Sequence, residues 1–388
     1  MTAPQIAARI ESLGASIGGG ASQDSTTVFV SAPTANIEAA GAILAQVVSQ
    51  PAFAQTELDR ERRRALDQLR VSMRDPSFVA QRVAWRAVYG DAPYGAPPGG
   101  TPASLAALTR DDLVAYFHNW WRPENATLVI TGSLDAEAGF ALAERLLGDW
   151  AGVMEPMPPL PANRAGTAPA PRVIVVDNPA SDQSAVAIVT RGIARSDPDY
   201  FPLVIANSAL GGSSTARLFQ EVRVRRGLSY GANSGLPSYR DEGLLVAIAQ
   251  TRNTGATETA QVMLNEIRRM REEPITADVL NKRRTLLVGA FGRQVETTNG
   301  LGNFLSGLAV QGLPMSDFGR YIPGLQAVTP EQVTASVAAE IDPAQASIVI
   351  VGRASEFIEA FRAQHPNVEV IPISELDFGS ASLRAGAR

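Results

Sequence analysis

The chain has 388 residues, with 34 lysines and arginines against 39 aspartates and glutamates, so its formal net charge at pH 7 is −5. This length suits two domains better than one core, and the mildly acidic charge argues against broad nucleic-acid binding. The absence of cysteine excludes disulfides and thiolate metal sites but does not distinguish cytoplasm from periplasm.

Histidines and apolar runs set further limits. The sequence has only His118 and His365, far apart, so it lacks a two-histidine zinc motif. Its most apolar runs, such as residues 348–351, are far shorter than the roughly 20 residues of a membrane helix. Arg9 and Glu11 lie in the N-terminal stretch, where a signal peptide would have an uninterrupted apolar core. We therefore expect a soluble protein without a membrane partner.

The first third of the chain predicts one strand among helices. A helix closed by Gly14 precedes a strand rich in β-branched residues, and a loop rich in glycine and proline follows the later helices. The predicted elements are a helix over 6–14, a strand over 25–31, helices over 36–48 and 55–70, and a turn-rich loop over 89–101.

The helix over 55–70 carries a run of charges. One face holds, at spacings of four, three and four, the polar residues Glu57, Glu61, Arg64 and Gln68. Such a run usually marks a solvent-exposed helix face.

A proline-rich stretch divides the chain. Six prolines fall within residues 155–171, a density that prevents a helix or a central strand. We therefore predict a first repeat over 1–152, a semi-rigid linker over 153–171 and a second repeat over 172–388.

The two halves share a pattern. Residues 109–132 read as a capped helix, a proline and Ala-Thr-Leu-Val-Ile-Thr-Gly, and residues 329–352 read as a capped helix, a proline and Ala-Ser-Ile-Val-Ile-Val-Gly. The matching positions, Thr109 and Thr329 among them, are offset by 220. This offset indicates an internal duplication into two α+β repeats of similar topology, with a strand over residues 126–130 in the first.

The second repeat predicts strands over 173–176 and 185–189, followed by a helix that leads into Gly211 and Gly212. The diglycine could suggest a phosphate cradle, but no Gly-Lys-Ser/Thr follows it, so that signal is weak. The tail from Gly379, rich in alanine, glycine, serine and arginine, predicts poor order.

Residues 218–230 hold the strongest candidate for chemistry. Apolar residues at helical spacing are followed by three arginines and then Gly227, which predicts a helix, a C-cap and a strand. Arginines in a last helical turn complement the helix dipole, so a structural role alone would explain them.

The block Leu-Gly-Gly-Ser-Ser-Thr-Ala-Arg-Leu-Phe at 210–219, followed by Arg223 and by Gly-Leu-Ser-Tyr at 227–230, resembles the C-terminal-domain signature of the pitrilysin, or insulinase-like, zinc metallopeptidases. It is similar to bacterial members that resemble the mitochondrial processing peptidase. In that family an arginine and a tyrosine seven positions later bind substrate beside zinc held by another domain. The resemblance gives these roles to Arg223 and Tyr230, whose donors suit a scissile carbonyl and its oxyanion. It implies that substrate also contacts Gly211, Gly212, Ser213 and Phe219.

The resemblance also implies a fold and a metal position. The fold is α+β, with two homologous repeats, each a mainly antiparallel β-sheet with helices packed on one side. The zinc-motif helix, His-x-x-Glu-His, would precede Met1. Gln68 takes the place of the family's zinc-ligand glutamate, and Glu61 matches a supporting acid. Because an amide is a weak zinc ligand, we expect no metal on this chain and zinc in a partner subunit.

Three functions fit these residues. The first is the non-catalytic subunit of a heteromeric zinc peptidase, inactive alone, whose partner carries His-x-x-Glu-His and whose substrate is a peptide. The second is an inactive peptide-binding or scaffold protein. The third, a truncated single-chain peptidase, requires Gln68 to act as a ligand. The compartment, cytoplasm or periplasm, is left open.

Overall fold

The computed structural model describes residues 1–152 and 155–386. Its backbone forms two compact units, each assembled from separate stretches of the chain. Unit 1 comprises Met1–Asp67, Pro102–Pro161 and Phe291–Phe318, and unit 2 comprises Gln68–Thr101, Ala162–Ala290 and Gly319–Arg388. The division into repeats at 1–152, 153–171 and 172–388 stays a prediction, and residues 153–154 of the predicted linker lie outside the described residues.

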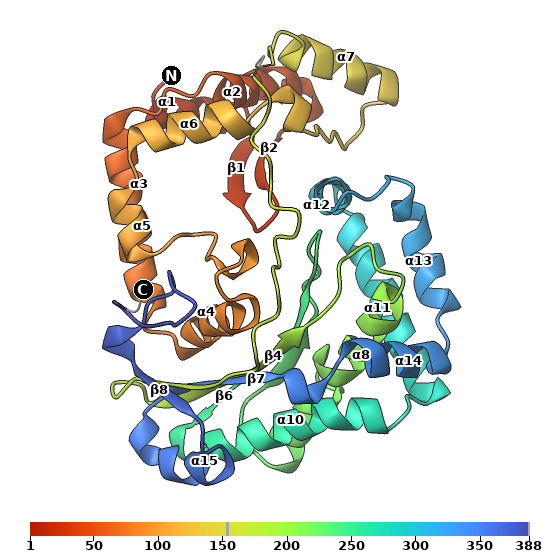
Figure 1. The fold of residues 1–388 in the computed structure, drawn as a ribbon. Helices are drawn as coiled ribbons and strands as arrows, with labels where there is room; N and C mark the ends of the chain where they lie inside the picture. The colour runs from red at the N-terminus through yellow and green to blue at the C-terminus, as the bar shows by residue number, and fades with distance from the viewer. Residues whose placement is uncertain (153–154, 387–388) are drawn as a thin grey trace. The chain divides into compact units, whose positions relative to one another are not determined.

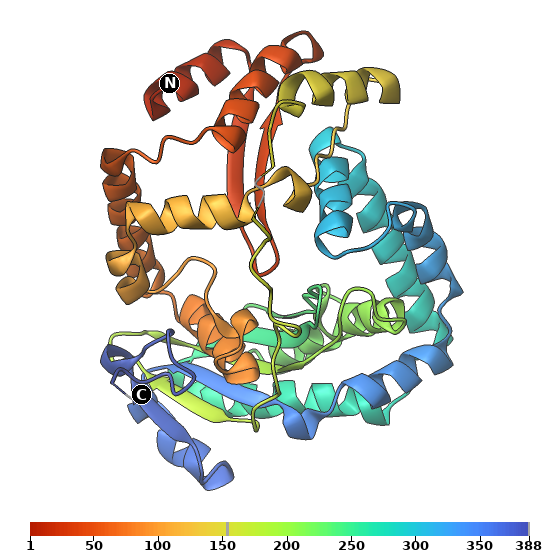
Figure 2. The same cartoon turned by 45° about the horizontal axis from the view of Figure 1, so that its top comes forward.

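Unit 1 is mainly helical around one β-hairpin (Figure 2). Strands β1 and β2 pair antiparallel, with Ser16 opposite Ser31 and Ala21 opposite Thr26. Helix α3 (Gln55–Ser72) runs on into unit 2, and α11 (Ala277–Val295) runs from unit 2 into unit 1. The other elements of unit 1 are α1 (Ala3–Ser12), β1 (Ser16–Ala21), β2 (Thr26–Ser31), α2 (Ile37–Ser49), α5 (Pro102–Ala107), α6 (Arg110–Trp120), α7 (Ala136–Leu147) and α12 (Thr298–Val310).

Unit 2 is built on a six-stranded sheet in the order β5-β6-β4-β7-β3-β8. Neighbours from β5 to β7 pair antiparallel, whereas β3 pairs parallel with both β7 and β8. The strands are β3 (Val173–Asp177), β4 (Gln183–Arg191), β5 (Ala232–Gly235), β6 (Leu244–Arg252), β7 (Ser347–Gly352) and β8 (Glu369–Pro372). The helices are α4 (Pro76–Tyr89), α8 (Tyr200–Gly211), α9 (Arg217–Phe219), the π-helix η4 (Gln220–Arg225), α10 (Ala256–Glu272), α13 (Asp317–Ala327), α14 (Pro330–Glu340) and α15 (Ile358–Gln364).

Helices cover both faces of this sheet (Figure 1). Alternate residues of β7 point to opposite faces. Ile350 joins the core that α8, α10 and α14 complete, and Val349 joins the core built with α4. Both side chains are fully buried. Helix α4 comes from the first half of the chain. One face of the six-stranded sheet is therefore covered by residues of the first predicted repeat.

The structure confirms the α+β class and most of the predicted elements. The helix predicted over 6–14 is α1, and Gly14 follows it with a φ of +59°. The helices α6 and α14 keep the offset of 220 residues, because they run from Arg110 to Trp120 and from Pro330 to Glu340. Within the described residues, no helix is both long and apolar enough to cross a membrane.

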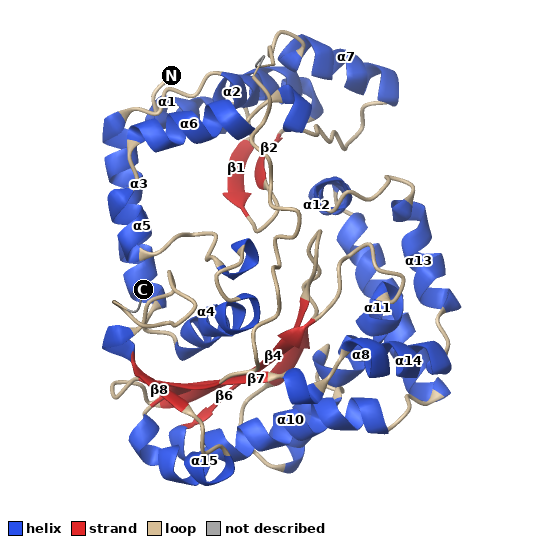
Figure 3. Ribbon diagram, viewed as in Figure 1, coloured by secondary structure: helices blue, strands red, loops and turns tan. Residues whose placement is uncertain are grey.

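Two predictions for local structure are wrong. Residues 126–130 form no strand (Figure 3), because no described strand pairs with them as β3 and β4 pair with β7. The tail from Gly379 is packed as far as Arg384, since Leu383 is fully buried and Arg384 donates to the Val370 carbonyl. Residues 387–388 of that tail lie outside the described residues.

Candidate functional site

A short π-helix carries Arg223. The backbone turns from α9 into η4 without a break and ends at Gly227, whose φ of +61° is one that side-chain-bearing residues rarely adopt. Beyond this turn the Leu228 amide donates to the Val222 carbonyl at 2.8 Å. Short π-helical segments occur frequently at functional sites. The sequence predicted the helix and its glycine end but not the wider π turn, and the next strand begins only at Ala232.

Arg223 and Tyr230 lie on adjoining parts of this turn. Arg223 Nη1 donates to the Tyr230 carbonyl oxygen at 2.8 Å, and the guanidinium lies over the Phe219 ring, 5.1 Å from its centroid. Arg223 is exposed, and the Tyr230 side chain projects outward, with 88% of the residue exposed. The turn therefore presents a cationic and a phenolic donor from one rigid stretch of backbone.

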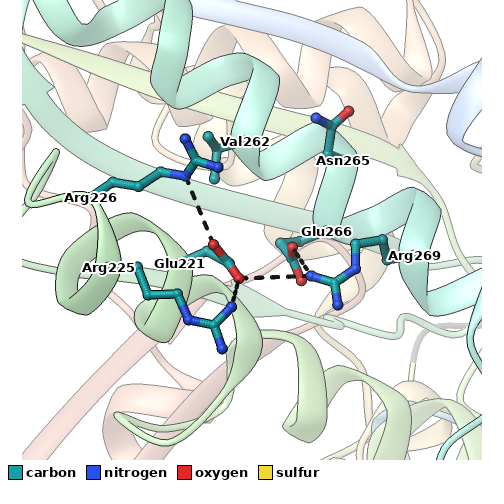
Figure 4. Close-up of a pocket in the computed structure, with 7 residues that line it drawn as sticks. All are labelled: Glu221, Arg225, Arg226, Val262, Asn265, Glu266 and Arg269. Carbon is teal, nitrogen blue, oxygen red and sulfur yellow. Dashed lines mark hydrogen bonds and ion pairs between the residues drawn. The ribbon is translucent and has the colours of Figure 1, made fainter.

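An ion-pair network ties the buried side of η4 to α10 (Figure 4). Glu221, only 9% exposed, pairs with Arg225 and Arg226 of its own turn and with Arg269 of α10. Arg269 also pairs with Glu266 at 2.7 Å. These residues line a polar pocket of about 570 Å³. Since every arginine in the pocket has a carboxylate partner, the pocket anchors η4 and leaves little free charge for a ligand.

The loop before α9 is held by close packing and by one arginine. A Cβ on Gly211 would lie 2.2 Å from the Ser234 amide nitrogen of β5, so the backbone approach requires glycine there. Gly212 is exposed and Ser213 is partly exposed. Arg283 of α11 donates to Ser213 Oγ at 2.7 Å and to the Thr215 carbonyl at 2.8 Å. The glycines therefore have a packing role that the sequence did not predict. Their predicted contact with substrate stays a prediction.

The residues at the family's zinc positions make other contacts. Gln68 is exposed and its amide donates to Ser72 Oγ at 3.4 Å, while Glu61 pairs with Arg60 and Arg64 of α3. Across residues 1–152 and 155–386, no group of three histidine, cysteine, aspartate or glutamate side chains could hold a metal ion. An exposed amide and an acid already paired with arginines do not fit a zinc site.

Sequence reasoning missed Glu221, Glu266, Arg269 and Arg283. A signal existed for the network, because Glu221–Arg225 and Glu266–Arg269 have the four- and three-residue spacings of helical ion pairs. Nothing in the sequence indicated that Arg283 would reach Ser213, since the two residues are 70 positions apart.

The fold is that of a zinc-peptidase family. Residues 1–101 match the family model for insulinase (peptidase family M16), and residues 107–287 match the model for the peptidase M16 inactive domain. The chain belongs to the insulinase-like peptidase family M16, which confirms the resemblance drawn from residues 210–230.

Relatives of this chain are named zinc proteases. It is 28% identical over 250 residues to an uncharacterized zinc protease of Mycobacterium leprae, a match that covers 64% of this chain and 56% of the relative. It is 23% identical over 304 residues to an uncharacterized zinc protease of Bacillus subtilis, covering 77% of this chain and 71% of the relative. The match to the mycobacterial relative thus spans little more than half of that protein's length.

Solved structures share the fold. The peptidase M16 inactive domain from Pseudomonas fluorescens superposes with a TM-score of 0.81 at 24% identity, covering 91% of this chain and 84% of that one. A protease from Helicobacter pylori superposes with a TM-score of 0.85 at 17% identity, covering 91% of this chain and 85% of that one. At these identities the likeness establishes the fold alone.

Proposed function

We propose that this chain is the non-catalytic subunit of a heteromeric zinc peptidase and that Arg223 and Tyr230 bind the substrate peptide. The observation that carries the proposal is the η4 turn, which presents an exposed guanidinium and an exposed phenol from backbone fixed by Gly227 and by the Glu221 network. The partner subunit carries His-x-x-Glu-His and the zinc, because Gln68 and Glu61 do not fit that role.

The two donors suit the developing negative charge of amide hydrolysis. A guanidinium stays charged at any physiological pH, and a phenol donates one hydrogen bond. Donors aimed at the carbonyl oxygen act most strongly where charge develops in the transition state, so they raise turnover more than they raise affinity. A zinc ion held by the partner would supply the attacking water, while Arg223 and Tyr230 of this chain orient and polarise the scissile carbonyl.

The test mixes this chain with a His-x-x-Glu-His chain from the same organism and follows cleavage of a quenched-fluorescent peptide library, with and without chelator. We expect silence from this chain alone and chelator-sensitive turnover from the mixture. The substitution Arg223→Ala or Tyr230→Phe should lower turnover roughly 100- to 1,000-fold, the usual loss for one oxyanion donor.

Association of the two chains is measured in parallel by sedimentation. A matched control is Tyr116→Phe, since Tyr116 is also an exposed tyrosine, at 52%, but lies on α6 of unit 1. Turnover that survives both site substitutions would remove Arg223 and Tyr230 from the site and favour the peptide-binding scaffold instead.

A further inference from the structure

Arg283 is a buried cation that contacts the loop before α9. It lies on α11 and is 8% exposed. Its Nη1 donates to Ser213 Oγ at 2.7 Å and to Thr215 Oγ1 at 3.2 Å, and its Nη2 donates to the Thr215 carbonyl at 2.8 Å. The remaining donor, Nε, is buried without a hydrogen-bond partner. All the acceptors are neutral, so this guanidinium is directed at the loop rather than at an acid.

No carboxylate among the described residues forms an ion pair with Arg283. Other arginines near the turn differ in this respect, since Arg217 pairs with Glu273, and Arg225 and Arg269 pair with Glu221. Burial lowers the pKa of the Arg283 guanidinium, and no nearby acid offsets that effect. The guanidinium remains charged at neutral pH, so the loop carries an uncompensated positive charge, which the low dielectric around a buried group screens only weakly.

The hydroxyl groups of Ser213 and Thr215 relay the polarising effect of this charge toward the surface. Ser213 Oγ and Thr215 Oγ1 lie 3.1 Å apart, so one donates to the other while both accept from Arg283. The second hydroxyl hydrogen then has no acceptor in the described part of the loop. Thr215 is exposed and Ser213 is partly exposed. The loop thus ends in a hydroxyl donor that is polarised by a buried cation and can reach an outside acceptor.

We propose that Ser213, Thr215 and Arg283 form a subsite that recognises a carboxylate of the bound peptide, either an acidic side chain or the C-terminus. This rests on the proposed function, in which the loop faces substrate. A hydroxyl that already accepts from a guanidinium is a better donor to a negative oxygen than to a neutral carbonyl, because hydrogen bonds to charged groups are stronger. Arg283 acts through the hydroxyls as a positioning residue, while Ser213 and Thr215 touch the ligand.

The experiment measures fluorescence anisotropy of labelled short peptides with the full chain alone, so that no partner or turnover is needed. Peptides are paired to differ only by Asp or Asn at one central position, and each is made with a C-terminal acid or amide, which separates the two sources of carboxylate. We expect at least one acid form to bind about tenfold tighter than its neutral twin, the usual difference for one charge-assisted hydrogen bond.

The variants are chosen to separate recognition from folding. Arg283→Met keeps the volume of the buried side chain and removes its charge, and it should reduce the acid-to-neutral ratio to about one. The double variant Ser213→Ala/Thr215→Ala should do the same without touching the buried guanidinium. Arg284→Met is the control, because Arg284 lies on the same helix but donates to the carbonyls of Leu325 and Val328, and it should keep the preference.

Each outcome supports or overturns the subsite or the proposed peptidase role. Equal binding of all twins by the wild-type chain, or a preference that survives the double alanine variant, overturns the subsite. If peptides bind without preference while the mixture with a zinc subunit still cleaves them, only the subsite fails. If the acid preference holds while no partner yields turnover, only the proposed peptidase role fails. If no peptide binds the chain alone, the subsite fails, and turnover by the mixture still decides the proposed function.

Discussion

Residues 127–132 and strand β7 have similar sequences and different structures. Both are apolar runs that follow a capped helix and a proline, yet β7 is fully buried in the middle of a sheet, and residues 126–130 form no strand. The glycines that end the two runs differ likewise: a Cβ on Gly352 would lie 2.1 Å from Ser184 Oγ, whereas a Cβ on Gly132 meets only Thr298, at 3.9 Å. A central strand is therefore made by its neighbours, β3 and β4, and not by its own residues.

The strongest test of this comparison between residues 127–132 and β7 replaces the matching isoleucine in each run by alanine. Ile130 and Ile350 occupy matching sites of the predicted duplication, but Ile130 is 38% exposed and Ile350 is fully buried. Replacing Ile350→Ala should cost about 2–5 kcal/mol of unfolding free energy, because it removes core contacts and leaves a cavity. Replacing Ile130→Ala should cost less than about 1 kcal/mol. Urea unfolding of the two variants measures both effects.

An equal loss at the two positions would break the comparison. It would mean that residues 127–132 are covered as completely as β7, and that something pairs with them in the folded protein. A small loss at both positions would instead contradict the burial of Ile350 in the core that it shares with residues of α10 and α14.

A second, smaller difference concerns how the hairpin connections are held. The turn between β1 and β2 is closed by its own hydroxyls, with Ser22 Oγ and Ser25 Oγ 3.1 Å apart. The connection between β5 and β6 is instead tied to a distant segment, because Arg164 donates to both carboxylate oxygens of Asp241 at 2.7 Å. Hydrogen bonds from Arg164 hold the pKa of Asp241 below its usual range.

Asp241→Asn should therefore cost about 1–3 kcal/mol at pH 7, since it leaves a half-buried guanidinium with a weaker partner. Because the folded state lowers the pKa of Asp241, the pair stabilises the protein fully above the unfolded value, about pH 4. That contribution disappears as the pH falls through the lower folded value, so the gap between wild type and variant should narrow below about pH 4.

Unfolding at a series of pH values checks this, with Asp182→Asn as the control. Asp182 is 96% exposed and pairs only at 3.4 Å with Arg353, so its substitution should change stability little at any pH. A gap that stays constant down to pH 3 would show that the Arg164 contact does not depend on the charge of Asp241.

Local signals in the sequence predicted much of this fold, and long-range partners account for what they missed. The cap at Thr109, the glycine after α1 and the apolar run of β4 each depend on a few adjacent residues, so the sequence predicted them directly. The lack of a described partner strand for residues 126–130, the burial of Leu383 and the contact of Arg283 with Ser213 depend on residues far away in the chain. In the candidate site, a sequence motif predicted Arg223 and Tyr230. The π turn and the ion-pair network of Glu221 depend instead on packing against α10.

The smallest expected effects lie at the helix starts, where the two predicted repeats have the same structure. Thr109 caps α6 by accepting from the Asp112 amide at 3.2 Å, and Thr329 caps α14 by accepting from the Gln332 amide at 3.3 Å. Each helix start also has the reciprocal bond of a capping box. Thr109→Ala and Thr329→Ala should therefore each cost about 1 kcal/mol in urea unfolding. Near-equal losses would show that the two predicted repeats share local structure even where they do not share strand pairing. A cost at Thr329 several times that at Thr109 would instead mean that tertiary packing sets the value of the cap.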